Sequence, residues 1–259
     1  MDKLSEHLKR PLIELLLSVA DDKFMLGHRN ADWTGLAPIL EEDIAFSALS
    51  QDEIAHASAL YDMVAQLQGS KADRLAFGRK PDEYRCAQIV ELSDEFDWAK
   101  ALCRNFFCDH FDILRLGRLA QSRFTPLAQL AGRLAAEEQI HVEHVDSWMR
   151  RLGRGGMDPY RRIQEALGSL APLAPALLEP TEGLDLLEAE GIYPKTTPGT
   201  FERWSGDLGR LARDAGLKLE LQPLAANFMG GRHGKHSELF LPLLDELTEV
   251  YRIEPEAAW

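Results

Sequence analysis

The sequence predicts an all-α protein, a four-helix bundle of long helices with additional C-terminal helices. Apolar residues recur every three or four positions through four long stretches of the first 153 residues, which is the spacing of a buried helix face. Prolines and glycines stand near the ends of most of these stretches, where helices commonly begin and end. Each apolar stripe also contains acidic residues. Acids on core-facing stripes are costly unless something pairs with them, so a shared buried site is expected.

The first two helices should be joined by one loop. The first is expected from about Leu4 to about Arg29, with Pro11 in its first turn if the helix proper begins there. The loop that follows contains Trp33-Thr34-Gly35. Pro38 suits the first turn of the second helix, which should continue to Gln68 and stop at Gly69.

The connection to the third helix is basic and polar. Residues 70–81 are expected to form a solvated loop, or else a contact for an anionic group or an acidic partner. A short helix is expected around residues 85–92. Asp94 or Asp97 would cap the third helix, which should run to about Gln121.

The fourth helix should open at Thr125-Pro126, a cap followed by a first-turn proline, and close at Gly153. The glycine-rich joint at 153–156 separates a predicted bundle of residues 1–153 from a C-terminal helical extension of residues 154–259. In that extension we expect a brief extended piece near 217–221 and helices at 157–170, 182–190, 200–216 and 236–251.

Two Glu-x-x-His pairs carry the chemistry of the prediction. Glu53 and His56 lie on the apolar stripe of the second helix, and Glu138 and His141 lie on that of the fourth. Residues three apart share a helix face, so each pair points one carboxylate and one imidazole in the same direction. In both stripes these polar residues interrupt positions that should face a core.

The other two helices each offer one acid. Asp22 interrupts the stripe of the first helix and Asp109 that of the third, whereas Asp21 lies on a stripe that looks more solvated. A di-iron bundle takes one carboxylate from each of two helices and a Glu-x-x-His pair from each of the other two. The predicted metal ligands are therefore Asp22, Glu53, His56, Asp109, Glu138 and His141.

Carboxylates and imidazoles suit iron or manganese, and four carboxylates nearly neutralise two divalent ions. Two ferrous ions with open positions can reduce dioxygen and insert oxygen into a substrate. Asp52 and Glu137 directly precede the ligand glutamates. They would accept the free N–H of a ligand histidine, or be ordinary solvated acids. The alternative to a metal site is a buried salt-bridge network, or a ligand set that no longer holds metal.

Composition excludes several functions. With 29 basic and 42 acidic residues the formal net charge is −13, which argues against non-specific binding to nucleic acid and to anionic membranes. The three cysteines form no CxxC motif, and reduced thiols in a cytoplasmic protein are the simplest interpretation. No targeting segment is visible, and the longest apolar region, residues 166–178, is broken by prolines and too short to span a bilayer.

Several segments resemble the phenylacetic acid catabolic protein family. They are Leu26-Gly27-His28-Arg29, Trp33-Thr34-Gly35 and residues 37–45 near the start, and residues 187–192 and 230–239 in the tail. The tail segments are similar to those of the PaaC-like members, which are subunits of a multicomponent phenylacetyl-CoA epoxidase. The resemblance covers nearly the whole chain.

The resemblance implies a ferritin-like fold and a hetero-oligomeric complex. In it a PaaA-like subunit carries the working di-iron centre, a PaaC-like subunit is its scaffold, and a reductase delivers electrons from NADPH. The complex epoxidises the aromatic ring of phenylacetyl-CoA. The scaffold-type chains have apolar or amide residues where Glu53, His56 and Glu138 stand here, so this chain is expected to retain a ligand set of its own. The alternatives are a metal-free scaffold subunit and a stand-alone ferritin-like di-iron oxidase.

Overall fold

The computed structural model describes residues 4–93, 95 and 97–255, and over these residues it contains helices and no β-strand. The all-α prediction is confirmed. The chain divides into two compact units. We call them the N-terminal unit, made of Ser5–Ser93, Pro180–Glu182 and Met229–Trp259, and the central unit, made of Met1–Leu4, Asp94–Glu179 and Gly183–Phe228.

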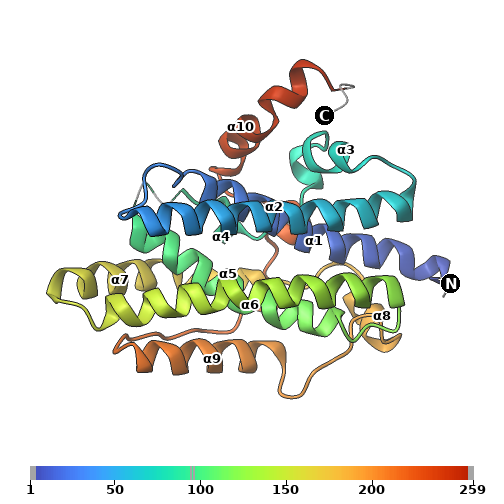
Figure 1. Cartoon of the computed structure of the whole chain (residues 1–259). Helices are drawn as coiled ribbons and strands as arrows, with labels where there is room; N and C mark the ends of the chain where they lie inside the picture. Colours follow the sequence, from blue (N-terminus) through green and yellow to red (C-terminus); the bar gives the residue numbers. More distant parts are fainter. Residues whose placement is uncertain (1–3, 94, 96, 256–259) are drawn as a thin grey trace. The chain divides into compact units, whose positions relative to one another are not determined.

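The N-terminal unit is built on two long helices that lie side by side, α1 (Glu6–Ala31) and α2 (Leu40–Gln68), drawn in blue shades in Figure 1. α2 ends where predicted, because Gly69 adopts a left-handed conformation with φ of 70° and its N–H donates to the carbonyl of Ala65. The shorter elements are α3 (Ala72–Phe77), η1 (Pro81–Glu83), α4 (Gln88–Glu91), η3 (Gly231–His233) and α10 (Phe240–Ile253).

Two details of this unit differ from the prediction. α1 begins at Glu6, so Pro11 lies inside the helix rather than in its first turn. Only the hydrogen bond to one early carbonyl is lost there, which a helix tolerates near its N-terminus. The basic connection of residues 70–81 contains α3, whose Leu75 and Ala76 are buried, so it is not wholly a solvated loop.

The central unit is also built on a pair of long helices, α5 (Trp98–Leu119) and α6 (Thr125–Gly153). Asp97 caps α5, with its side chain accepting from the N–H of Ala99 at 2.9 Å, while Asp94 lies outside the described residues. The other elements are α7 (Met157–Leu170), η2 (Ala174–Leu178), α8 (Leu184–Ala189) and α9 (Thr200–Asp214). The segment 217–221, predicted to be extended, forms no strand within the described part of the chain.

The predicted joint at residue 153 is a point of close packing inside the central unit. α6 ends at Gly153, and a Cβ atom there would lie 2.3 Å from the carbonyl oxygen of Ala215. Glycine at this position lets the segment after α9 pass directly against the end of α6. Residues on both sides of the joint belong to the same unit.

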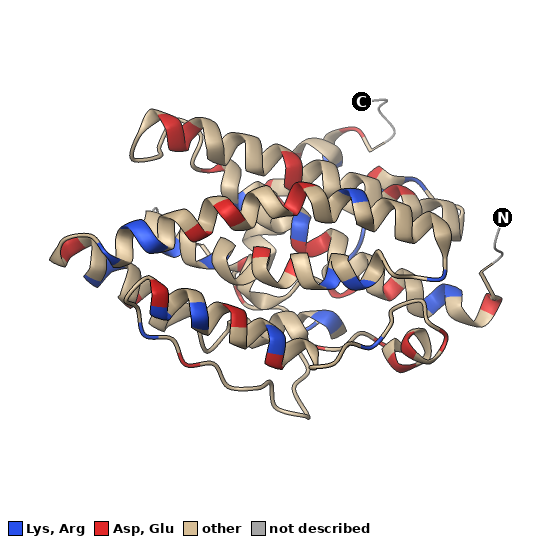
Figure 2. Cartoon of the chain, turned by 60° about the horizontal axis from the view of Figure 1, so that its bottom comes forward, with Lys and Arg blue, Asp and Glu red and all other residues tan. Residues whose placement is uncertain are grey.

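The surface carries both signs of charge. Figure 2 shows basic and acidic residues interspersed along the helices, and on α7 Arg161 pairs with both Asp158 and Glu165 at helical spacing. In the described residues no helix combines the length and the apolar character that crossing a bilayer requires.

The close approach at Gly153 gives a test of the fold. The Gly153→Ala variant should be destabilised by about 1–3 kcal/mol, because the new methyl group meets backbone atoms that cannot rotate away. Chemical denaturation of the purified protein measures this change. Gly206→Ala is the matched control, since Gly206 lies inside α9 with open space beside it. Alanine there should be neutral or stabilising by about 0.5–1 kcal/mol. Equal effects of the two substitutions would contradict the packing described here.

Candidate functional site

The residues predicted as metal ligands all lie in the interior. Each is at most 3% exposed, as expected from the apolar stripes that contain them: Asp22, Glu53, His56, Asp109, Glu138 and His141. Asp52 and Glu137, which were predicted to support the ligand histidines, are exposed on α2 and α6.

Three of the six lie together within the central unit. Asp109 comes from α5, and Glu138 and His141 come from one face of α6. Their candidate ligand atoms lie within 4.8 Å of one another, and Nδ1 of His141 is 3.9 Å from Oε2 of Glu138. Two buried carboxylates and an imidazole at this separation can bind a metal ion.

Asp22, in the N-terminal unit, is paired with an arginine. The guanidinium of Arg232 donates to both carboxylate oxygens of Asp22, each at 2.7 Å, and the N–H of Ala87 donates to Oδ1 at 2.8 Å. Such a two-pronged pair is the strongest geometry for an ion pair between arginine and a carboxylate. Both side chains are at most 4% exposed, so the charge of Asp22 is balanced by the protein itself.

Glu53 is paired with a lysine. Nζ of Lys23 on α1 donates to Oε2 of Glu53 on α2 at 2.9 Å, and neither side chain is more than 1% exposed. His56 follows one turn later on the same buried face of α2. A buried ammonium group 2.9 Å from a candidate ligand oxygen stands where a cation would otherwise be needed.

Asp21, the weaker candidate for the first ligand, was expected on a solvated stripe, and that expectation is wrong. Asp21 is fully buried and accepts hydrogen bonds from the Tyr61 hydroxyl, from the Arg79 guanidinium and from the N–H of Arg85 at 2.6 Å. Burial, and then the Asp21 carboxylate, raise the pKa of the Tyr61 hydroxyl well above its usual value. Tyr61 therefore stays protonated and donates. Basic residues from after α3 cover this stripe.

The two cations were missed for different reasons. Lys23 stands next to Asp22 and continues the apolar positions of α1 by one helical step. A lysine on a core-facing stripe could have been recognised as a partner for a buried acid. Arg232 lies in the tail, 210 positions from Asp22. Nothing in its local sequence except the preceding glycines indicates burial.

Comparison with known proteins agrees with this arrangement of helices. The family described as "Phenylacetic acid catabolic protein" matches residues 1–259. The chain belongs to this family. It is also 27% identical, over 246 residues, to a protein of Escherichia coli (strain K12) that is named as the C-type component of 1,2-phenylacetyl-CoA epoxidase. The matched region covers 94% of this chain and 97% of that protein.

The match confirms the resemblance inferred from the sequence and gives the tail segment a structural role. Residues 230–239, which resemble those of PaaC-like members of the phenylacetic acid catabolic proteins, include Arg232. Besides Asp22, this side chain reaches the carbonyl oxygens of Ser18 and Arg85, at 3.0 and 2.7 Å. One arginine from the tail therefore ties α1 to the segment that precedes α4.

The buried pair gives a test with a matched control. Arg232→Ala leaves the Asp22 charge buried, and this should lower the free energy of unfolding by about 3–5 kcal/mol. Arg252→Ala breaks a pair of the same chemistry, Arg252 with Asp245, in which both side chains are more than half exposed, so it should change stability little. Chemical denaturation of both variants measures the difference. If the two variants unfold at the same denaturant concentration, Arg232 is not a buried counterion.

Proposed function

We propose that this chain is a C-type component of a phenylacetyl-CoA epoxidase complex, and that its role in the complex is structural. The complex would act in aerobic phenylacetate degradation in the cytoplasm. The proposal of the complex rests on the family and on the nearly full-length match to the E. coli protein. Oxygen activation would then belong to a PaaA-like partner, which receives electrons through an NADPH-dependent reductase.

The structural role rests on one observation, which is that protein cations neutralise two of the four predicted carboxylates. Arg232 holds Asp22 and Lys23 holds Glu53. Four free carboxylates would match the charge of two divalent ions. With two of them already paired, a second divalent ion would lie close to an ammonium or guanidinium group and would gain no compensating negative charge. The predicted di-iron set therefore does not fit as a whole.

A second candidate keeps a metal in this subunit. Asp109, Glu138 and His141 favour it, because they form a compact buried group of ligand types that bind iron or manganese. On this alternative the chain holds its own metal centre, either inside the epoxidase complex or as a stand-alone ferritin-like oxidase. Lys23 and Arg232 would have to leave their partners for all six predicted ligands to act.

Iron content separates the two candidates. Protein purified without a metal-binding tag from iron-rich medium should contain fewer than about 0.1 equivalents of iron, because the paired acids leave no complete ligand set. Elemental analysis measures it, and the Glu138→Ala variant should contain no less than the unmodified chain. About two equivalents that disappear in Glu138→Ala would establish the di-iron candidate instead.

Assembly tests the remaining part of the proposal. Co-expressed with the catalytic epoxidase subunit of the same organism, this chain should co-purify with it through size-exclusion chromatography. The expectation follows from the structural role, since such a subunit has no substrate chemistry of its own. The chain expressed alone is the control for self-association. If the pair separates completely while the chain alone consumes oxygen in the presence of a reductant, the stand-alone oxidase is correct.

A further inference from the structure

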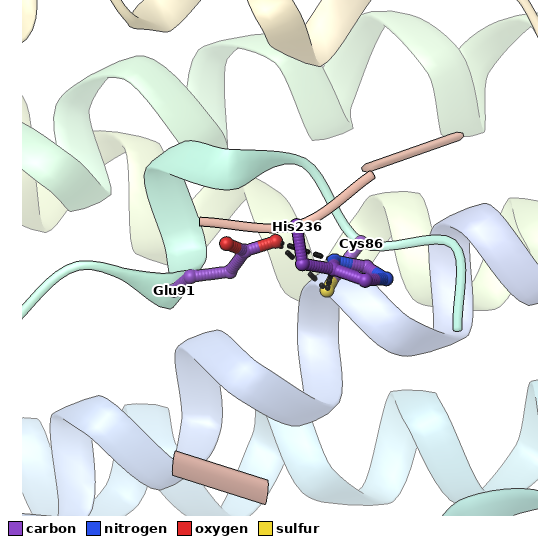
Figure 3. Close-up of side chains that lie close together, drawn as sticks. All are labelled: Cys86, Glu91 and His236. Atoms are coloured by element: carbon purple, nitrogen blue, oxygen red, sulfur yellow. Dashed lines mark hydrogen bonds and ion pairs between the residues drawn. The ribbon is translucent and has the colours of Figure 1, made fainter. Parts of the chain in front are cut away.

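Three chemically distinct side chains of the N-terminal unit converge outside the predicted site. Cys86 precedes α4, Glu91 ends α4, and His236 follows η3 in the tail. Figure 3 shows the three side chains directed toward one another. Sγ of Cys86 is 3.8 Å from Oε1 of Glu91 and 3.8 Å from Nδ1 of His236, and these last two atoms are 2.6 Å apart.

The group is buried. Cys86 and Glu91 are fully inaccessible, and the His236 side chain is 7% exposed. A thiol, a carboxylate and an imidazole within reach of a single point are an unusual set for a protein interior, because a carboxylate there is costly without compensating charge. Together they offer one ligand atom each within the separation that a metal ion requires.

The surrounding contacts fix the three ligands in place. Oε2 of Glu91 accepts from the N–H of Ser237 at 2.7 Å, so only Oε1 faces the group. The His236 ring stacks on Phe240, with ring centroids 3.9 Å apart. Gly231 lies against the backbone of Cys86, where a Cβ atom would be 1.7 Å from the carbonyl oxygen. The ligand atoms are therefore preorganised, which favours binding of a small ion.

The donor types select the ion. Thiolate and imidazole are preferred by zinc, and a carboxylate is its common third ligand. Zinc bonds of about 2.3 Å to sulfur and about 2.0–2.1 Å to nitrogen or oxygen place tetrahedral ligand atoms about 3.3–3.6 Å apart. The sulfur separations of 3.8 Å lie a few tenths of an ångström above that range. The separation of 2.6 Å between Oε1 and Nδ1 is that of a shared proton, and it would open when an ion replaces the proton.

We propose that Cys86, Glu91 and His236 form a binding site for one zinc ion, with water as the fourth ligand. The thiol releases its proton to solvent as sulfur binds, and the thiolate and carboxylate together neutralise the ion. His236 lies 145 positions from Glu91 and 150 from Cys86. Zinc bound here fastens the tail to the segment around α4, beside the ion pair of Arg232 with Asp22. The site contains none of the six predicted ligands and stands whether or not this chain holds iron.

Cobalt substitution provides the test, because a thiolate bound to Co²⁺ gives a charge-transfer absorption in the near ultraviolet. Tag-free, chelator-treated full-length protein titrated with Co²⁺ should develop this absorption and saturate at about one equivalent. Added Zn²⁺ should then bleach it. The group of Asp109, Glu138 and His141 contains no sulfur, so Co²⁺ bound there gives no such absorption.

The control removes a different buried thiol. Cys86→Ala should abolish the absorption, whereas Cys103→Ala, which deletes a fully buried cysteine of α5, should keep it. His236→Gln retains the thiol and should weaken Co²⁺ binding by at least about tenfold. The proposal is overturned if the unmodified chain shows no thiolate absorption, or if the absorption survives in Cys86→Ala. Should Cys86→Ala fail to fold, unchanged Co²⁺ affinity in His236→Gln overturns it equally.

Discussion

The interior of the N-terminal unit depends on matching each buried acid with a base. Asp21 is held by Arg79, Asp22 by Arg232, and Glu53 by Lys23. A charge placed in a protein interior without a partner costs several kcal/mol. These pairs therefore decide which segments must lie next to α1 and α2, in addition to what apolar packing decides.

The tail is the clearest consequence of that constraint. Arg232 enters the interior from a segment without long helices, and two glycines near it, Gly231 and Gly234, allow the backbone to approach the segment before α4. Gly234 has a φ of 71°, and a Cβ atom at this residue would lie 2.3 Å from the carbonyl oxygen of Asp82. A side chain at either position would push the tail outward. Arg232 would then lose Asp22, so backbone shape and buried charge depend on each other here.

The helices could be predicted because their determinants are local. Gly69 stops α2, Asp97 caps α5 and Thr125-Pro126 opens α6, each within a few residues of the boundary it sets. The stripes also identified correctly which acids are buried, since burial on a helix follows from the spacing of its apolar residues. Pro11 was misplaced because the turn before it is helical in spite of its polar residues.

The partners of the acids could not be predicted in the same way. A stripe shows that Asp22 faces the interior, but its counterion comes from the other end of the chain, through a segment with no periodicity. The metal interpretation assumed that a buried acid without an obvious local partner requires an external cation. Lys23 shows why that assumption is weak, since a lysine reaches about as far as a metal ion bridges and supplies the same sign of charge. Where a helix bundle carries basic residues on the faces that carry its acids, the acidic pattern alone does not distinguish a metal centre from an internal ion pair.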